Sequence, residues 1–438
     1  MYDVIVIGGG AAGLMAAGTA ARLGHKVLLL EKMEKAGRKV RITGKGRCNL
    51  TNMRPHEEFL EMVRTHADFF RPAFKAFDNR STVEFFTRLG VALATERGER
   101  VFPCSGRAWD VADALVGWCV RGGVTVEYDA RVTDIRTEKG RVCAVEYAEH
   151  DSMAAYSGRR RRKNEPKRPE IRTESCRNVI LCTGGVSYPA TGSTGDGYTL
   201  ADRLGHRIEP VRPSLVPLES DLPQIRTLRG LQLKNITAHL SVDGRRVASE
   251  FGEMEFTDRG VGGAIVLRLS RDAVDALIEE HRVELVLDLK PALSETKLDA
   301  RIDRERELFA DKDGARLEDL LRKLIPRSLV PHLARKMGLQ PRMTLKSVSP
   351  DRLHSLTDIL KNFVIPVSDY RPFEEAIVTA GGIDVSQIDP TTLQSKLIGG
   401  LYFAGEVLDL DANTGGYNLQ IAFSTGHLAG QLKENPTV

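Results

Sequence analysis

Three glycines near the start of the chain have the spacing of a dinucleotide-binding loop. Gly8, Gly10 and Gly13 follow the pattern G-x-G-x-x-G. In this pattern the first glycine allows a tight turn, the second lets backbone approach a pyrophosphate, and the third lets a helix pack closely on a strand. Glu31 stands where a carboxylate would accept hydrogen bonds from the adenosine ribose hydroxyls and disfavour a 2′-phosphate. These residues predict a site for FAD or NAD rather than NADP.

The elements that must position these residues are also visible in the sequence. Residues 2–7 form a short apolar run with the length of a buried parallel strand. Residues 11–23 are rich in Ala and contain no Pro, which favours a helix whose N-terminal N–H groups face the phosphates. We expect Gly24 to end that helix and residues 26–30 to form a second strand, closed by Glu31.

A second glycine-rich segment, residues 36–52, is crowded with cations. Its glycines and basic residues alternate closely: Gly37, Arg38, Lys39, Arg41, Gly44, Lys45, Gly46 and Arg47. Such a loop suits a polyanion or the electron-rich edge of a ring. The alternative interpretation is a flexible surface loop, which its position directly after Glu31 disfavours.

Later segments are expected to return to the same cofactor. A buried strand at 178–182 opens into the glycine stretch 183–185, and a strand at 399–404 leads to Glu406, whose carboxylate can hold hydroxyl groups. A helix beginning at 416–418 can place its positive end against a flavin pyrimidine. No second G-x-G-x-x-G follows a strand. We therefore expect no dedicated nicotinamide domain, and FAD rather than NAD as the resident cofactor.

The middle of the chain has a different character. Runs of β-type residues between 206 and 289, with turn signals such as Asp243-Gly244, predict a small antiparallel barrel or sheet. Residues 295–362 are charged, have leucines at helical spacing and are broken by prolines. The predicted fold is α/β, a Rossmann-type FAD-binding domain with an inserted antiparallel β-barrel domain and a helical subdomain. The predicted boundaries are 1–197 with 366–438 for the FAD-binding domain, 198–294 for the barrel and 295–365 for the helical subdomain.

Composition excludes several other classes of protein. The 438 residues are 42% hydrophobic and 28% charged, as in ordinary globular proteins, and no apolar run has the length of a membrane span. The first residues enter a strand without an export signal, and six cysteines without a C-x-x-C pair predict reduced thiols and no metal site. We expect a cytoplasmic protein that does not contact membranes.

The formal charge of +4 is unevenly distributed. Residues 159–168 contain seven basic residues and one acidic residue, a net charge of +6, so the rest of the chain is near −2. A solvated loop is the favoured interpretation of this run. Contact with nucleic acid is the alternative, and it is disfavoured because no aromatic residues are interleaved with the charges.

Several of these segments match motifs of one flavoprotein family. They are residues 8–14, 44–52 (Gly-Lys-Gly-Arg-Cys-Asn-Leu-Thr-Asn), 183–189, 195–197, 252–257 and 405–430, which includes Thr-Gly-Gly-Tyr-Asn. On these motifs the chain resembles the HI0933-like flavoproteins, also called the YhiN- or BaiN-like family, of the glutathione-reductase-type FAD superfamily. The resemblance covers nearly the whole length. It implies an FAD-binding Rossmann-type domain with an inserted barrel and helical subdomain, and NAD(P)- and FAD-dependent oxidoreductase activity, linked in the family to aminoacetone oxidation and to bile-acid enone reduction.

The candidate site residues are spread along the chain. In flavoproteins with this fold a backbone amide in a strand such as 130–135 contacts the adenine, and Val132 is the candidate. Tyr188, Tyr417 and Cys48 are the expected pocket side chains, with packing as the alternative role for the tyrosines and a neutral wall residue as that for Cys48. No catalytic acid or base is identified. The residues expected to bind FAD are Gly8, Gly10, Ala12, Gly13, Glu31, Lys32, Arg38, Lys39, Gly46, Arg47, Cys48, Asn49, Val132, Thr183, Gly184, Gly185, Gly405, Glu406, Gly416, Tyr417 and Asn418.

These features predict an FAD-dependent oxidoreductase acting on a small molecule. FAD is expected to bind non-covalently and NAD(P)H to visit as a transient co-substrate, with transfer to a small organic acceptor such as an enone. The alternatives are an oxygen-using amine oxidase of the aminoacetone type, an RNA-associated flavoprotein, and a flavin-binding redox sensor without turnover. The sequence makes no prediction of the oligomeric state.

Overall fold

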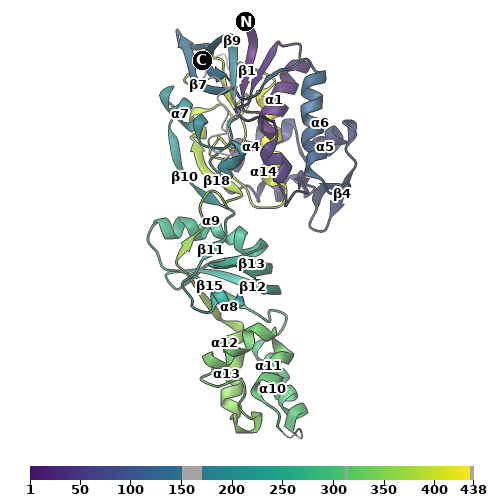
Figure 1. Ribbon diagram of the computed structural model, residues 1–438, viewed down its shortest axis with the longest axis vertical. Helices are drawn as coiled ribbons and strands as arrows, with labels where there is room; N and C mark the ends of the chain where they lie inside the picture. The colour runs from purple at the N-terminus through teal and green to yellow at the C-terminus, as the bar shows by residue number, and fades with distance from the viewer. Residues whose placement is uncertain (150–169, 311, 313, 435–438) are drawn as a thin grey trace, which may run out of the picture. The chain divides into compact units, whose positions relative to one another are not determined.

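The computed structural model describes residues 1–149, 170–310, 312 and 314–434. The chain divides into two compact units, Met1–Pro213 with Phe373–Val438 and Ser214–Pro372 (Figure 1). Each unit buries a hydrophobic core of its own. The first unit is therefore discontinuous in sequence, and the second is one continuous insertion.

A parallel sheet forms the centre of the first unit. β1 (Tyr2–Ile7) pairs in parallel with β2 (Val27–Leu30) on one side and with β9 (Glu170–Leu181) on the other. β6 (Thr125–Glu127) extends the sheet beyond β2, and β19 (Leu401–Phe403) pairs with β9, both in parallel. The carboxyl ends of these strands meet at one edge, where α/β sheets bind their ligands. The predicted Rossmann-type fold is confirmed.

β9 combines two kinds of pairing. Its second half runs parallel to β1, and its first half pairs antiparallel with β8 (Arg141–Glu149), which pairs in turn with β7 (Arg131–Glu138). Apolar runs at 142–147 and 178–182 predict a hairpin around the basic run at 159–168. In the structure β8 pairs instead with residues 170–175, and residues 178–181 pair with β1, so the predicted partner is wrong. The run itself lies outside the described residues.

Two helices pack closely on the carboxyl edge of this sheet. α1 (Ala11–Arg22) follows β1, and α14 (Tyr417–Ala429) packs against α1 (Figure 1). A Cβ atom on Gly13 would lie 1.8 Å from the Gly8 carbonyl oxygen, and one on Gly426 would lie 2.3 Å from the carbonyl oxygen of Ala12. Both contacts are backbone to backbone, so neither position accepts a larger residue without displacement.

The remaining elements of the first unit surround this centre. Aromatic residues at helical spacing between 56 and 90 predict a core, and the structure buries Phe59 and stacks its ring on Phe74 at 4.4 Å. β10 and β18 form a separate two-stranded sheet. The elements are α2 (Arg38–Ile42), β3 (Thr51–Asn52), α3 (His56–Leu60), α4 (Ala67–Ala76), α5 (Asn79–Arg88), β4 (Leu93–Glu96), β5 (Arg100–Pro103), α6 (Ala108–Arg121), η2 (Pro189–Thr191), α7 (Asp196–Arg203), β10 (Ile208–Ser214), β18 (Val378–Ile383) and η5 (Val385–Gln387).

The second unit contains an antiparallel sheet. Its strand order is β16–β15–β12–β13–β14–β11–β17. The chain passes from β16 at one end of this ladder through Ser368 into β17 at the other end, and the two strands do not pair with each other. The closed barrel expected from the sequence therefore stays a prediction. The strands are β11 (Leu218–Glu219), β12 (Gln232–Val242), β13 (Arg245–Phe256), β14 (Gly260–Gly262), β15 (Val283–Asp288), β16 (Phe363–Val367) and β17 (Asp369–Tyr370).

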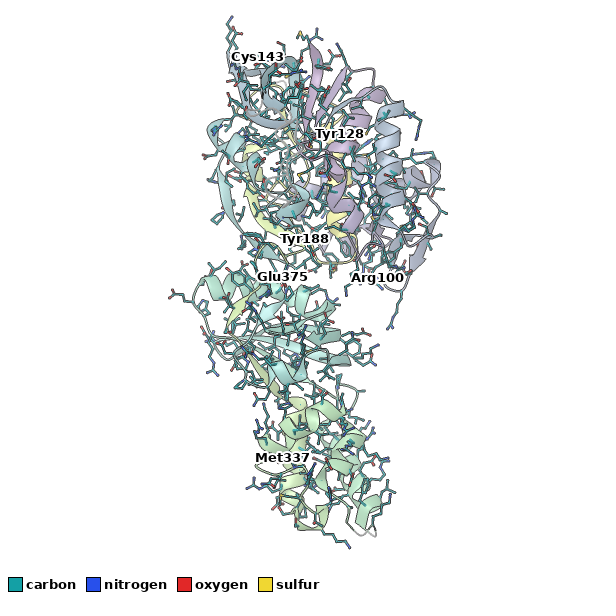
Figure 2. The ribbon with its side chains drawn as sticks, in the orientation of Figure 1. Arg100, Tyr128, Cys143, Tyr188, Met337 and Glu375 are labelled. Atoms are coloured by element: carbon teal, nitrogen blue, oxygen red, sulfur yellow. The ribbon has the colours of Figure 1, made fainter. Side chains whose placement is uncertain are left out.

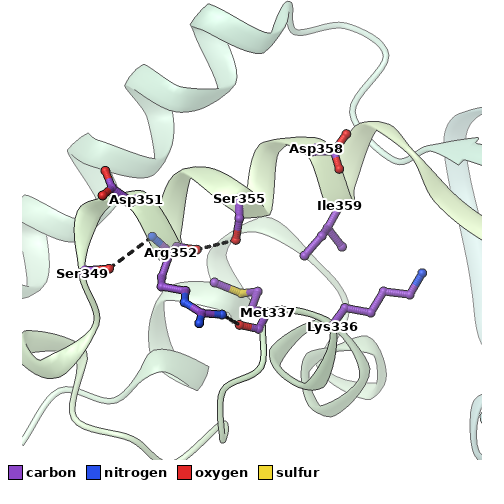
Figure 3. A pocket seen from close by; sticks show the side chains of 8 residues that line it. All are labelled: Lys336, Met337, Ser349, Asp351, Arg352, Ser355, Asp358 and Ile359. Carbon is purple, nitrogen blue, oxygen red and sulfur yellow. Dashed lines mark hydrogen bonds between the residues drawn. The ribbon is translucent and has the colours of Figure 1, made fainter.

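Helices complete the second unit. Most of their leucines are buried, as the helical spacing predicts, although Leu308 is exposed. Arg352 joins two of these helices by donating to the Met337 carbonyl at 2.8 Å (Figure 3). No described helix is long and apolar enough to cross a membrane. The helices are α8 (Ile225–Leu228), α9 (Ala264–Ile278), α10 (Glu295–Ala310), α11 (Leu317–Leu324), η3 (Arg327–Leu329), α12 (Val330–Lys336), η4 (Leu345–Ser347) and α13 (Pro350–Lys361).

The contact between α1 and α14 yields a stability prediction. We expect Gly426→Ala to lower the free energy of unfolding by about 1–3 kcal/mol, because the new methyl group overlaps the Ala12 backbone. Urea denaturation followed by circular dichroism measures the change. Gly262→Ala is the control, since a Cβ there would meet nothing closer than 3.5 Å. Equal stability of the two variants would contradict the prediction.

Candidate cofactor-binding site

The glycine loop leaves open backbone at the start of α1. Gly8 adopts a φ of +100°, and its N–H donates to the Leu30 carbonyl at 2.8 Å, which fixes the turn beside β2. A Cβ on Gly10 would meet nothing within 4 Å, and this residue caps α1 without a side-chain hydrogen bond. Ala12 follows in the first turn of the helix. The loop can thus accept a phosphate group against exposed N–H groups.

Glu31 is buried and held in place by backbone donors. Its Oε2 accepts from the Gly9 N–H and its Oε1 from the Met33 N–H, both at 2.8 Å. Burial raises the pKa of the carboxyl above its ordinary value, and the two backbone hydrogen bonds partly offset this. Each carboxylate oxygen keeps a lone pair for a further donor such as a hydroxyl. Tyr128, whose pKa is also raised by burial and by Glu31, lies in the same part of the unit (Figure 2).

A partly buried polar cluster joins segments that are far apart in the sequence. Lys39 Nζ donates to Ser187 Oγ at 2.6 Å and to Glu406 Oε2 at 2.7 Å. Glu406 Oε1 also accepts from Ser187 Oγ at 2.7 Å and from the Thr379 N–H at 2.8 Å. Lys39 and Glu406 were predicted site residues, and Ser187 and Thr379 were not. Ser187 lies inside the 183–189 motif and could have been found there, whereas Thr379 carries no local signal.

Two other predicted cations are engaged by the segment around η2 and the start of α7. Lys32 Nζ bonds Asp196 at 2.8 Å and also contacts the Thr194 hydroxyl. Arg38 donates to the Ala190 carbonyl at 3.1 Å. These partners hold the segment against the loop that follows β2, so both cations help to shape the wall of the site.

The three side chains of the Arg-Cys-Asn motif lie in different surroundings. Arg47 pairs with Glu96 and lies over the Phe102 ring at 4.3 Å, so it points to the β4–β5 hairpin. Cys48 is fully buried, and burial raises the pKa of its thiol to about 12, which fits the neutral wall residue of the sequence interpretation. Asn49 Oδ1 is buried and has no hydrogen-bond partner among the described residues. It is the side-chain atom of this motif that calls for a ligand.

The Gly-Gly-Tyr-Asn motif is locked against the Thr51-Asn52 strand. A Cβ on Gly416 would lie 2.5 Å from the Thr51 carbonyl group, and Asn52 donates to the Gly415 carbonyl at 3.2 Å. Tyr417 is buried, with its ring 4.8 Å from the Phe59 ring, so packing is its observed role.

Asn418, Gly405 and Gly185 are also in close contact with other residues of the first unit. Asn418 accepts from the Ala412 N–H at 2.9 Å and donates to the Ala412 carbonyl at 2.7 Å. Gly405 donates to Thr425 Oγ1 at 2.9 Å, and a Cβ on Gly405 would lie 2.7 Å from Ala12 Cβ. A Cβ on Gly185 would lie 2.4 Å from Thr379 Oγ1. Gly405 thus lies beside Ala12, and Thr183 lies beside Gly8, while the contact of 183–185 and 405–406 with the cofactor stays a prediction.

The other predicted residues are less constrained. Thr183 and Gly184 are half-buried, Gly184 with a φ of +74°, and a Cβ on Gly46 would meet nothing within 4 Å. Tyr188 is half-buried with a φ of +52° (Figure 2). Val132 is buried in β7 beside a register shift, and its contact with adenine stays a prediction.

The second unit carries a separate open groove. Its volume is about 620 Å³, and none of the predicted cofactor-binding residues lines it (Figure 3). Two basic residues, Lys336 and Arg352, and two acidic residues, Asp351 and Asp358, line it, so its charge is balanced. The groove has no feature that selects a dinucleotide.

Open backbone at Gly10, the buried Glu31 carboxylate and the unpartnered Asn49 oxygen together fit FAD. The fold and site define a Rossmann-type flavoprotein. The chain belongs to the HI0933-like family, since the family described as "HI0933-like protein Rossmann domain" matches residues 2–432. It is an FAD-dependent oxidoreductase, and the resemblance drawn from the sequence motifs is confirmed.

The relatives that match over nearly their full length are named for two different substrates, a bile acid and ribosomal RNA. A 3-dehydro-bile acid delta(4,6)-reductase of Clostridium scindens is 31% identical and covers 98% of both chains. A ribosomal RNA dihydrouridine synthase of Escherichia coli (strain K12) is 27% identical, covering 98% of this chain and 97% of that protein. Its namesake in Haemophilus influenzae is 28% identical, covering 97% of this chain and 96% of that one.

Crystal structures of other proteins share this fold. The 3-ketosteroid delta1-dehydrogenase from Sterolibacterium denitrificans matches with a TM-score of 0.51 and 15% identity, covering 98% of both chains. At this identity the similarity shows the fold alone.

Glu31 gives a prediction about cofactor affinity. We expect Glu31→Gln to weaken FAD binding about 10- to 100-fold, because hydrogen bonds that involve a charged group contribute about 1.5–3 kcal/mol. The FAD affinity of the wild type should also fall as the pH drops, because the carboxylate takes up a proton. The FAD affinity of the variant should not change over the same pH range. Titration of apoprotein with FAD, followed by flavin fluorescence, measures both effects. Glu138→Gln, at an exposed position in β7, is the control. Parallel pH dependence in variant and wild type would exclude this role.

Cysteine reactivity tests the environment of Cys48. We expect iodoacetamide at pH 8 to modify the exposed Cys104 and to leave Cys48 unmodified, because the buried thiol with a pKa of about 12 forms almost no thiolate. Mass spectrometry of peptides from the native protein measures the order of labelling. Labelling of Cys48 at the rate of Cys104 would show an accessible, reactive thiol.

Proposed function

We propose that this protein is an FAD-dependent reductase that saturates a carbon–carbon double bond conjugated to a carbonyl group in a small organic molecule. The observation that carries the proposal is the full-length similarity to a 3-dehydro-bile acid delta(4,6)-reductase. Its name denotes reduction of double bonds in a molecule with a 3-keto group. The other relatives are named for dihydrouridine, in which the uracil double bond conjugated to a carbonyl is saturated. The same chemistry links both names.

The described residues support non-covalent FAD binding by segments 1–197 and 366–438. The Gly8–Gly13 loop would hold the pyrophosphate, Glu31 the ribose, and the Val132 backbone the adenine. The Lys39–Ser187–Glu406 cluster offers hydrogen bonds for hydroxyl groups of the cofactor. Asn49 Oδ1 and the start of α14 would face the flavin ring. The bound flavin would supply a hydride, while the protein orients it.

NAD(P)H is the proposed reductant and binds only transiently, because the sequence has no second dinucleotide motif. We expect anaerobic addition of NADH or NADPH to bleach the flavin absorbance of the holoprotein. Reoxidation by 2-cyclohexen-1-one or a 4-en-3-one steroid should then restore it. Consumption of oxygen with aminoacetone, without bleaching by either nucleotide, would instead favour the amine oxidase. Binding of FAD without turnover of any acceptor would favour a redox sensor.

RNA is the second candidate substrate, and a charge asymmetry in the second unit favours it. Residues 316–346 contain eight basic residues, all exposed, and two acidic ones. The two acids are engaged locally: Glu318 pairs with Arg322 at 3.2 Å, and Asp319 accepts from the Arg316 N–H at 2.9 Å. The neighbouring helix α10 has four basic and five acidic residues, so the excess is confined to this stretch. Such a surface suits a phosphate backbone.

A pair of double variants tests this alternative. Lys323→Gln with Arg335→Gln removes two charges from the basic stretch, and Lys297→Gln with Arg304→Gln removes two exposed charges from α10. If RNA is the substrate, the first pair should weaken binding of in-vitro transcribed ribosomal RNA and lower the salt slope by up to about two, and the second should not. Filter binding across salt concentrations measures both. Absence of salt-dependent affinity in the wild type would discard RNA as the substrate.

A further inference from the structure

A histidine and an aspartate from distant parts of the chain form a pair in the first unit. His66 Nε2 lies 3.0 Å from Asp409 Oδ2. The Asp409 side chain is 10% exposed and the His66 side chain 42% exposed. The aspartate is thus an internal anchor, and the imidazole reaches solvent.

This pair differs from the other His–Asp pairs of the described residues. Those are His56–Asp78, His281–Asp243 and His354–Asp303, at 2.9, 2.8 and 3.1 Å. Their aspartates are 18%, 54% and 46% exposed, so Asp409 is the most buried of the four. His66 is also the only one of these histidines in the left-handed region, with a φ of +55°. A non-glycine residue held there marks a position that its surroundings enforce.

The surroundings that hold His66 belong to the loop beyond β19. Arg64 N–H donates to the Asp411 carbonyl at 2.8 Å, and Thr65 Oγ1 donates to Asp411 Oδ1 at 2.5 Å. The Asn413 N–H donates to the Met62 carbonyl at 2.9 Å. Three contacts outside the pair therefore fix the segment 62–66 on this loop.

The same loop connects the two glycine elements of the cofactor site. It begins at Gly405, which touches Ala12 of the dinucleotide loop, and ends at Gly416, which caps α14. His66 is thereby held on the loop that follows the carboxyl end of β19, and ligands of this fold bind beyond the carboxyl ends of the strands. His66 Nδ1 has no hydrogen bond among the described residues, since the recorded bond uses Nε2. Nε2 is thus held by Asp409, and Nδ1 is left to exchange a proton with a bound molecule.

The groups facing the pair come from several elements. Burial raises the pKa of Asp409, the nearby Asp411 raises it further, and His66 and Arg212 of β10 lower it. Tyr198 of α7 lies close enough for Asp409 to raise its pKa. Asp411 is itself bonded to the Thr65 hydroxyl.

We propose that His66 is the proton donor of the reduction and that Asp409 is its positioning residue. The inference rests on the proposed reductase function. The cofactor, held by the residues named above, would supply the hydride for the β-carbon of the conjugated double bond, with the π electrons moving toward the carbonyl group. The proton on His66 Nδ1 passes to the α-carbon, which completes the saturated bond. Neutral His66 then regains a proton from water, which its exposure permits, while Nε2–H stays on Asp409.

The left-handed backbone of His66 makes one variant especially informative. Glycine adopts this conformation without strain, so His66→Gly should fold. We expect it to lose about 10²–10⁴-fold in the rate at which 2-cyclohexen-1-one reoxidises the reduced flavin. Added imidazole should restore part of that rate, and reduction by NAD(P)H should be unchanged. A histidine with only a structural role would show no rescue.

A matched control separates this pair from histidines in general. His56→Gln removes an exposed histidine that is paired to Asp78 at 2.9 Å in the same unit, and it should leave the reoxidation rate and its pH profile unchanged. His66→Gln should abolish the limb of the pH profile that reports the proton donor. An unaltered pH profile in His66→Gln, or no rescue of His66→Gly, would overturn the proposal.

A readout without turnover distinguishes the pair from the proposed function. Nitrogen-15 NMR of the apoprotein at pH 9 should place the single imidazole proton of His66 on Nε2, and Asp409→Leu should redistribute it. A proton on Nδ1 in the wild type would overturn the assignment of His66 even if the enzyme reduces enones. Failure of the wild type to reduce any enone or RNA, with the proton on Nε2, would refute the proposed function and the proton transfer with it.

Discussion

Close backbone packing at the carboxyl edge of the parallel sheet is the constraint on which the rest of the first unit depends. Gly13 sits against the Gly8 carbonyl, and Gly426 sits against Ala12. These contacts place the start of α1 directly above the end of β1 and bring α14 beside it. A side chain at Gly13 would push α1 away from the end of β1, and a side chain at Gly426 would push α14 away from α1. The open N–H groups at Gly10 and the approach of Gly405 both follow from that packing.

Much of the first unit could be predicted because its signals are local. The strand at 2–7, the helix after it and the strand before Glu31 have lengths and apolar patterns that a single window reveals. The predicted strand at 178–182 pairs in parallel with β1 and β19, so the antiparallel partner of β8 is the earlier part of β9, which was not predicted. The second unit was harder, because sheet closure depends on which strands lie at the two ends, and that is set by the path through Ser368. Alternation within a strand carries no information about its distant partner.

In the candidate site, too, residues with a local sequence signal could be predicted, and residues that depend on distant contacts could not. Glu31, Lys39 and Glu406 were identified from sequence position, and the structure gives Lys39 and Glu406 common partners. Thr379 and the His66–Asp409 pair were missed, since each depends on contacts between segments hundreds of residues apart. For Arg47 and Tyr417 the motif gives the place in the chain, and the structure adds side-chain contacts with Glu96 and Phe59, while their contact with FAD stays a prediction. A motif specifies a backbone path better than the direction of each side chain.

The discontinuous first unit has a consequence for the order of events during synthesis. Ribosomes deliver residues 214–372 before β19 and α14, and the inserted unit has its own core to bury. The glycine loop therefore has neither Gly405 nor Gly416 beside it until the last part of the chain has left the ribosome. Pairing of β10 with β18 across the insertion brings the two ends of the first unit together, and a folded insertion lowers the entropy cost of that closure. The candidate cofactor site would therefore be complete only after β19 and α14 have folded onto the rest of the first unit.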